Sequence, residues 1–348
     1  MFSQADADQL RESLPAIDFR GGDFRGGDFR GTECHDDSGL LGAYIDHYGL
    51  DLRRQGQPVG HRLGTIESGG FKLVCHYFYR DSLTQPGLNS AENRVENNRV
   101  DNKGTAFLIH GYFDHTGLYR HLISYALDAG YDVVIFDLPG HGLSSGPVAS
   151  INSFQEYGKA FEDCLALADA QELGRPWITI GQSTGAAVII DSLLHTDLAS
   201  RFDIQRYVLL CPLLRPSNWT WGGILYAVSR WLPYSTQRRF SNNSHDVEFL
   251  KFLERDDALQ SQRLPREWVA AMIDYQRRFA KAPASDIPLS IVQGSGDGTV
   301  DWRFNLRNLQ KKFPNSKSYL VADAKHHLVN ESREFRSRVF TAIDKCIG

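Results

Sequence analysis

The 348-residue sequence is poor in cysteine and lacks any long apolar segment. Its five cysteines are scattered and include no C-x-x-C pair, which argues against a disulfide framework and against a cysteine zinc site. No apolar run is long enough to span a bilayer, and the N-terminal stretch MFSQADADQLRESLP is acidic and lacks the apolar core of a signal peptide. We therefore expect a protein of a reducing compartment and predict a cytoplasmic location.

The sequence also lacks an excess of basic residues. Its formal net charge is −4, so nothing in the overall charge favours binding to nucleic acid or to an anionic membrane. Hydrophobic residues make up 42% of the chain and charged residues 23%, which is ordinary for a globular protein. The length suggests one large domain with an insertion, or two domains.

One repeat stands out, DFRGGDFRGGDFRG at residues 18–31. Its period of five matches neither a helix nor a strand, so Phe19, Phe24 and Phe29 would not share one face. Each unit contains one Asp and one Arg, and the repeat therefore adds no net charge with which to bind phosphates. We interpret it as a short tandem duplication in a flexible N-terminal arm spanning residues 1–60.

From about residue 61 the pattern becomes that of regular secondary structure. The segments HRLGTIES and FKLVCHYFY flank Gly69-Gly70 and predict a β-hairpin. Further along, apolar runs rich in β-formers predict strands buried on both faces of a parallel sheet. These runs are residues 105–110, 131–138, 177–181, 207–211, 289–294 and 318–323.

Segments with helical periodicity separate the predicted strands. One apolar stripe is formed by Phe154, Tyr157, Phe161, Cys164 and Leu165, and a second one by Phe335, Val339 and Ile343. The alternation predicts an α/β fold, with a mostly parallel central sheet and helices on both faces. It stops once, where helical patterns alone fill residues 215–286, so we expect a helical cap inserted between core segments 61–214 and 287–348.

Ligands of open α/β sheets gather at the carboxyl ends of the strands. At one such end, the run WITI leads into Gly181-Gln182-Ser183-Thr184-Gly185 and then into an apolar helical segment. This G-x-S-x-G sequence between a strand and a helix is typical of a sharp turn that exposes a nucleophilic serine. Ser183 is therefore the candidate nucleophile.

A serine hydroxyl needs a base, and the base needs an orienting group. Two later strand ends supply candidates, namely Asp297 after LSIVQG and the pair His326-His327 after SYLVAD. Taken together, the order Ser, Asp, His predicts a catalytic triad, although each residue alone would be an ordinary loop residue. For the oxyanion, the loop His110-Gly111-Tyr112-Phe113 follows another strand, and we expect the backbone N–H groups of Tyr112 and Thr184 to be the donors.

With these residues, the sequence resembles the α/β-hydrolases, in particular the monoacylglycerol lipase and lysophospholipase branch that is grouped with serine aminopeptidase S33-like hydrolases. The motifs that carry the resemblance are HGYFDHTGLY (110–119), DLPGHGLSSG (137–146), GQSTG (181–185), GSGDGTVD (294–301) and KHHLVNE (325–331). The family pattern His-x-x-x-Asn-Glu favours His326 over His327 as the base. The chain departs from the family at Tyr112, where a small or apolar residue is usual, and at Gln182 and Thr184, which flank the serine.

The resemblance implies cleavage of carboxylic esters, most simply of monoacylglycerols or lysophospholipids, through an acyl-enzyme on Ser183. It implies no metal and no organic cofactor. We expect the substrate to contact Gly111, Phe113 and an apolar helical face of the cap that includes Trp219, Trp221 and Leu225. The same face could make a transient contact with a membrane surface.

Several alternatives remain open at this point. An aminopeptidase or a thioesterase would use the same triad, and the cap contains acids that a substrate amine would need, Glu248, Glu254, Asp256 and Asp257. A binding module that kept the fold and lost turnover is a third possibility. We predict a small-molecule ester or lipid as the partner and no nucleic acid, while the oligomeric state is left undetermined.

Overall fold

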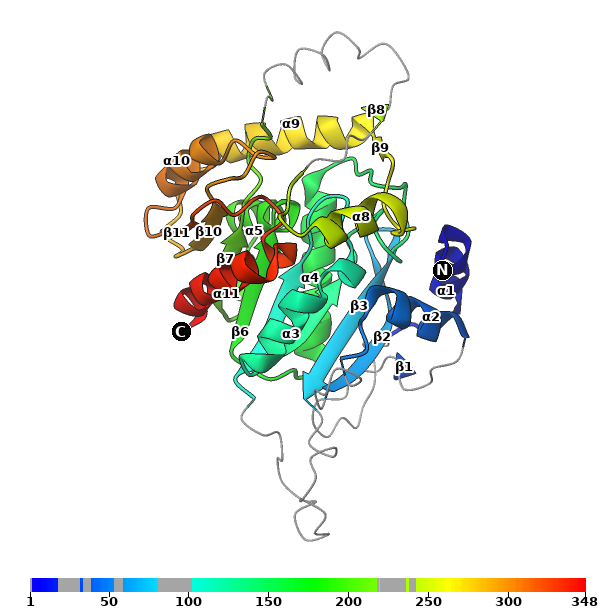
Figure 1. Cartoon of the computed structure of the whole chain (residues 1–348). Coiled ribbons are helices and arrows are strands. Elements are labelled where there is room, and N and C mark those ends of the chain that lie inside the picture. The colour runs from blue at the N-terminus through cyan, green and yellow to red at the C-terminus, as the bar shows by residue number, and fades with distance from the viewer. Residues whose placement is uncertain are drawn as a thin grey trace.

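The computed structural model describes residues 2–17, 32–33, 39–52, 59–80, 102–217, 219, 236–237 and 242–348. The repeat at 18–31 therefore lies outside the described residues, as do Trp221 and Leu225 of the expected cap face. Figure 1 shows the described elements grouped around one central sheet.

The central sheet has nine strands in the order β1-β2-β3-β5-β4-β6-β7-β10-β11. Its strands are β1 (Thr32–Glu33), β2 (Val59–Ser68), β3 (Phe71–Arg80), β4 (Gly104–Ile109), β5 (Tyr131–Phe136), β6 (Trp177–Gln182), β7 (Ile204–Leu210), β10 (Ser290–Gly294) and β11 (Lys317–Val321). The pairs from β5 to β11 are parallel, whereas β1, β2 and β3 pair antiparallel. The predicted fold class is confirmed, including the hairpin that turns at Gly69-Gly70.

Helices cover both faces of this sheet, and others lie beyond its ends. The described helices are α1 (Gln4–Ser13), α2 (Gly39–Tyr48), η3 (Thr116–Leu118), α3 (Arg120–Asp128), α4 (Phe154–Ala170), α5 (Thr184–His195), α6 (Leu198–Arg201), α8 (Val247–Arg255), α9 (Arg266–Lys281), α10 (Trp302–Lys312), η4 (Leu328–Asn330) and α11 (Arg333–Ile347). Figure 1 shows α3 and α11 on the near face of the sheet.

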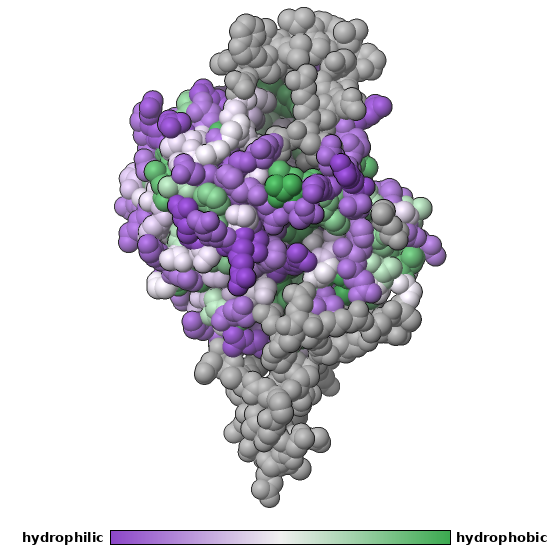
Figure 2. Space-filling model, in the orientation of Figure 1, coloured by the Kyte–Doolittle hydropathy of each residue, from purple (hydrophilic) through white to green (hydrophobic). Residues whose placement is uncertain are grey.

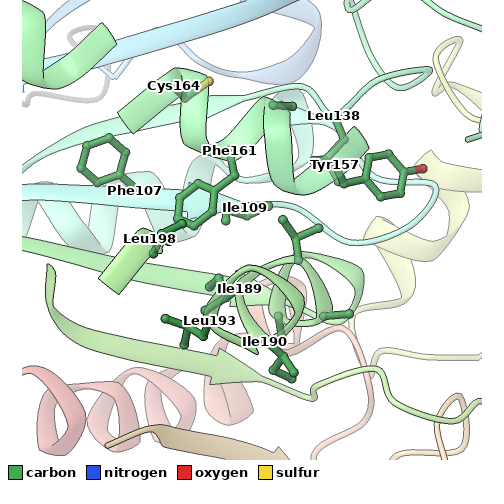
Figure 3. Close-up of a cluster of buried hydrophobic side chains, with 14 of the residues drawn as sticks. Phe107, Ile109, Leu138, Tyr157, Phe161, Cys164, Ile189, Ile190, Leu193 and Leu198 are labelled. Carbon is green, nitrogen blue, oxygen red and sulfur yellow. The ribbon is translucent and has the colours of Figure 1, made fainter. Parts of the chain in front are cut away.

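Alternating side chains of the strands build two hydrophobic clusters, one on each face. In β4, Phe107 and Ile109 join one cluster, whereas Ala106 and Leu108 join the other. Figure 3 shows part of the first cluster, in which Phe161 of α4 lies beside Phe107 and Ile109 of β4, with Ile189 and Leu193 of α5 close by. Burial on both faces explains why these strands are apolar throughout their length.

The segment between β7 and β10 contains α8, α9 and a short antiparallel pair, β8 (Thr236–Gln237) and β9 (Arg263–Leu264). Figure 1 shows α9 lying across the upper end of the molecule, above the carboxyl ends of the strands. One face of α9, including Trp268, Met272 and Tyr275, is buried in the same hydrophobic cluster as α4 and α5. This helix is therefore fixed to the core.

The N-terminal segment packs more closely than we expected from the sequence. Phe2, Leu10 and Tyr44 are almost inaccessible to solvent and join the second hydrophobic cluster. A capping box between Ser3 and Asp6 starts α1. The spacing of Ala7, Leu10 and Leu14 is a helical pattern, but it is too short to have predicted packing from the sequence alone.

Helix α2 ends at a buried polar junction with the cap and the loop after β4. The Tyr48 hydroxyl donates to Asp257 Oδ1 at 2.9 Å, and His115 Nε2 lies 3.1 Å from the same oxygen. Burial opposes ionisation of this carboxyl, but the neighbouring His115 outweighs it and lowers the pKa of Asp257 below its usual value. The junction thus joins three segments that are distant in the sequence.

Figure 2 shows that hydrophilic residues prevail on the near face of the described part, with hydrophobic residues only in small groups. Among the described residues, no helix is both long enough and apolar enough to cross a membrane.

We predict that Tyr48→Phe lowers the free energy of unfolding by about 1–3 kcal/mol, because a buried carboxylate loses a hydrogen-bond donor. Thermal melting of the variant and the wild type measures this. The control is Tyr125→Phe, which removes a hydroxyl bound to the more exposed Asp344 and should cost less. An equal effect of the two substitutions would contradict the importance of the junction.

Candidate active site

Ser183 lies in a strained turn between β6 and α5. Its φ is +52° and its ψ is −106°, a conformation that L-residues rarely adopt. The turn brings α5 so close to β4 that a Cβ on Gly185 would lie 2.1 Å from the carbonyl oxygen of Ile109. The motif therefore needs glycine there, and the strain presents the serine side chain at the sheet edge.

The structure brings Ser183, His326 and Asp297 together in one hydrogen-bonded chain. His326 Nε2 lies 3.0 Å from Ser183 Oγ, and His326 Nδ1 lies 2.8 Å from Asp297 Oδ2. All three residues are less than 10% exposed, with Ser183 at 8% and His326 at 6%. His327 faces elsewhere, with Nε2 3.0 Å from Asp114 Oδ1.

Asp297 is held by more than the histidine. Its Oδ1 accepts from the backbone N–H groups of Thr299 and Val300 at 2.8 and 3.1 Å, and its Oδ2 accepts from Gln293 Nε2 at 3.1 Å. A glutamine within a buried strand carries no motif, so Gln293 could not be recognised from its sequence context. These donors fix the carboxylate in the orientation that the imidazole needs.

The loop between β11 and η4 carries His326 and is called the histidine loop. Hydrogen bonds hold its backbone from two sides. The Gln182 side chain donates to the carbonyl oxygen of His326 at 2.9 Å, which gives a physical reason for a glutamine beside the serine. Glu331 is buried and accepts from the backbone N–H of Lys325 at 2.6 Å and from that of His245 at 2.7 Å. Asn330 donates to the carbonyl oxygen of Leu118 at 2.7 Å. Asn330 and Glu331 of the motif therefore hold this loop in place through buried hydrogen bonds.

The electrostatics of the His326–Asp297 pair are those of a histidine beside an ionised carboxylate. Burial disfavours the protonated form of His326, but the charge and hydrogen bond of Asp297 outweigh it, so the pKa of His326 lies above its ordinary value of 6.5. Burial likewise opposes ionisation of Asp297, yet His326 and the backbone donors lower its pKa. The carboxylate thus stays ionised and favours a proton on the imidazole.

One other potential ligand atom lies near this pair. Cys211 Sγ, a carboxylate oxygen of Asp297 and a ring nitrogen of His326 lie within 4.8 Å of one another, the one such group among the described residues. Burial raises the pKa of the Cys211 thiol, which keeps it protonated and a poor metal ligand. The Asp297–His326 hydrogen bond already occupies the other two groups.

The expected oxyanion donors border the serine. Thr184 is the first residue of α5, so its N–H belongs to the first turn, where backbone donors have no partner within the helix. Tyr112 lies in the loop after β4, and its ring stacks on Trp268 with centroids 3.9 Å apart. Its hydroxyl donates to the Ala149 carbonyl oxygen at 2.7 Å, so the Tyr112 ring is held in contact with Trp268 of α9.

A cavity of about 500 Å³ opens over these groups, a size common for small-molecule sites. Its polar lining includes Ser183, His326, Asp114 and His327, together with Gln182, Thr184, Ser217, Asn243 and Thr299. The apolar and glycine lining is Gly111, Tyr112, Phe113, Leu213, Pro216, Trp219, Leu253, Leu264, Trp268, Val269 and Val300. Gly111, Phe113 and Trp219 are thus at the cavity, as expected, and Trp219 is fixed there by donating to Gln276 Oε1 at 2.8 Å.

The four cap acids do not line this cavity among the residues that the structure describes. Glu248 is exposed and pairs with Lys251 at 2.8 Å, and Asp257 pairs with His115. The acid at the cavity, in the described part of the chain, is Asp114, which was not among the residues predicted from the sequence. Asp114 contacts His327, which is 213 positions away, and Tyr119, which is five positions away in the same loop. Neither contact produces a local sequence pattern that would identify Asp114.

Comparisons with known proteins agree with this geometry. The family of serine aminopeptidases S33 matches residues 100–333, which is more than half of the chain. The chain belongs to this family. Within the α/β-hydrolases it falls in the monoacylglycerol lipase-like branch, and it is a carboxylic ester hydrolase.

A monoacylglycerol lipase of Mycolicibacterium smegmatis is 30% identical over 210 residues, which cover 58% of this chain and 72% of that protein. A monoglyceride lipase homolog of monkeypox virus is 23% identical over 257 residues, covering 70% and 89% of the two chains. Among solved structures, a soluble variant of monoglyceride lipase from Saccharomyces cerevisiae, in complex with a substrate analog, superposes with a TM-score of 0.64 at 18% identity, covering 82% of this chain and 94% of that one. The last likeness concerns the fold alone.

We predict that Gln182→Ala lowers kcat about five- to tenfold, because one hydrogen bond that positions the His326 backbone, worth about 1 kcal/mol, is lost. Steady-state kinetics on a soluble ester measures the change. Gln205→Ala, an exposed position, serves as the control and should leave kcat unchanged. An unchanged kcat in Gln182→Ala would show that Glu331 alone suffices to hold the loop.

The pH dependence follows from the raised pKa of His326. The base must be neutral to accept the serine proton, so kcat/KM should fall as the pH drops through this pKa, with a midpoint above 6.5. A pH profile between about 5 and 9 measures the midpoint. A midpoint below 6.5 would mean that burial, and not Asp297, dominates at the imidazole.

Proposed function

We propose that the protein hydrolyses single-chain lipid esters, monoacylglycerols or lysophospholipids, through an acyl-enzyme on Ser183. The observation that carries the proposal is the chain Ser183–His326–Asp297 at the floor of a largely apolar cavity. The apolar walls suit an acyl chain, and the polar groups gathered near the serine suit an ester head. The names of the related proteins support the same substrate class.

The reaction proceeds in two steps. Ser183 Oγ attacks the ester carbonyl while His326 takes the serine proton, and the imidazolium then gives this proton to the departing alcohol. Asp297 holds the imidazole with Nε2 toward the serine and stabilises the imidazolium. The backbone N–H groups of Tyr112 and Thr184 donate to the oxyanion, and each such donor is worth about 3 kcal/mol. Water, activated by His326, releases the acid.

The family also contains aminopeptidases, so cleavage of amides is the second candidate. A substrate amine would need an acidic group with free acceptor capacity at the cavity. Asp114 is the acid there in the described part of the chain, and both of its oxygens are already bound, one by His327 and one by Tyr119. This arrangement favours a neutral ester over an amine. A thioester would meet the same groups and stays a candidate.

Labelling with a fluorophosphonate probe tests the activated serine. We expect a single adduct on Ser183 by intact mass and peptide mapping, and no adduct in Ser183→Ala. Ser192→Ala, a buried serine in the same helix, is the matched control and should label normally. Absence of labelling in the folded wild-type protein would favour a binding module that lacks turnover.

A substrate panel then tests the class. It contains monoacylglycerols, lysophospholipids, short esters, an acyl thioester and an aminoacyl amide at equal concentration. We expect kcat/KM to be highest for a single-chain lipid ester and at least tenfold lower for the amide. Faster release of amine than of alcohol would overturn the proposal in favour of a peptidase.

A further inference from the structure

A second buried histidine–carboxylate pair lies beside the first. His327 follows the base in the chain, but its Nε2 is 3.0 Å from Asp114 Oδ1, and the two residues are 3% and 6% exposed. The pair joins the histidine loop to the loop after β4, which carries Tyr112. Neither residue belongs to the Ser183–His326–Asp297 chain, and both border the cavity.

The other oxygen of Asp114 is connected by hydrogen bonds to the loop after β4 that carries Gly111 and Tyr112, here called the oxyanion loop. Asp114 Oδ2 accepts from the Tyr119 hydroxyl at 3.0 Å, and the same hydroxyl accepts from the backbone N–H of Gly111 at 2.9 Å. The contact is close enough that a Cβ on Gly111 would lie 2.7 Å from Asp114 Oδ2. A continuous set of hydrogen bonds therefore runs from His327 through Asp114 and Tyr119 to the residue before Tyr112.

The carboxylate of Asp114 is charged in this setting. Burial opposes ionisation, but the charge and hydrogen bond of His327 and the Tyr119 hydrogen bond outweigh it and hold the pKa of Asp114 well below its usual range. Burial lowers the pKa of His110 and so keeps that ring neutral. His115, the remaining histidine of the same loop, is paired with Asp257.

This charge also acts on the base. The groups that set the protonation of His326 are its burial, then Asp297 by charge and hydrogen bond, then Asp114 by charge, and both carboxylates raise the pKa of the imidazole. Ser183 Oγ, which is uncharged, and Cys211 Sγ, a thiol whose pKa burial raises, also lie near the ring. Asp114 lies in the lining of the same cavity as His326 and is hydrogen-bonded to the next residue, His327, so its charge acts on the imidazole through space.

We propose that Asp114 and His327 are positioning residues that hold the oxyanion loop and the histidine loop in register, and that the Asp114 charge assists Asp297 in stabilising the His326 imidazolium. The proposal rests on the proposed function, because it assigns a role in activating Ser183. It accounts for two polar residues at the cavity that the triad does not use.

The first test separates the charge from the packing. Asp114→Asn keeps the size and an oxygen that can accept from His327, but it removes the charge and replaces the oxygen that accepts from Tyr119 with an amide nitrogen, so the midpoint reports the charge and the plateau rate reports both changes. We measure the rate of fluorophosphonate labelling of Ser183 against pH, which requires no knowledge of the natural ester. The midpoint of the acid limb should move to lower pH by about half a unit to one unit, and the plateau rate should fall about tenfold.

The matched control is Asp191→Asn, a buried carboxylate on α5 that pairs with Arg278 at 3.0 Å and does not act on His326. It should lower the melting temperature and leave the midpoint in place. A midpoint in Asp114→Asn within 0.2 unit of the wild type, whatever the melting temperature, would overturn the electrostatic part of the proposal.

The second test addresses the register of the two loops. His327→Leu removes the donor to Asp114 and should lower the plateau labelling rate several-fold without moving the midpoint downward, because the Asp114 charge remains. His327→Gln retains an N–H donor and should recover most of the rate. Equal losses in both variants, or no loss in either, would overturn the positioning role.

The outcomes also separate this inference from the proposed function. If the wild-type protein does not label, the proposed function is wrong. If the wild-type protein labels, and the Asp114 and His327 variants have the same labelling rate and midpoint as the wild type, only the role of the Asp114–His327 pair is wrong.

Discussion

The site depends on one backbone constraint, the left-handed turn at Ser183. The parallel strand β6 delivers this residue to the edge of the sheet, and the helix α5 leaves at once in the opposite direction. The turn is tolerated because glycine at 185 lets α5 approach β4, and because the apolar face of α5 is packed against α4. The stability of the core thus maintains a conformation that would be unfavourable in isolation.

Around this turn, several loops build the surroundings of Ser183. Each loop follows a different strand and is tied to another by a buried hydrogen bond, such as the one from Gln182 to the His326 carbonyl. Three of these contacts between loops involve a buried carboxylate, that of Asp297, Asp114 or Glu331. Each carboxylate accepts hydrogen bonds from backbone or histidine donors. Such networks are costly when partly satisfied, which gives the active arrangement a single well-defined geometry.

The N-terminal segment belongs to the same system. Through Tyr48 it contacts Asp257 of the cap segment and, through that carboxylate, His115 of the loop that carries Tyr112. The helix α2, which lies between β1 and β2 in the sequence, is therefore linked to the loop that borders the cavity. The position of the cap is set both by this junction and by the burial of Trp268 and Tyr275 of α9 in the core.

The sequence by itself indicated the hairpin of β2 and β3, the parallel strands, the helices α4, α5 and α11, and the three residues of the Ser183–His326–Asp297 chain. These signals are local, since an apolar run between turns predicts a buried strand, and Ser183, Asp297 and His326 each follow such a run directly. Only the tertiary structure decided which side chains connect these segments and hold the three residues in place. Asp114 and Tyr48 acquire their roles from partners 213 and 209 positions away, and hydrogen bonds of this kind leave no periodic pattern. It likewise decided that His327 turns away from the serine, because backbone direction, and not residue type, separates two adjacent histidines.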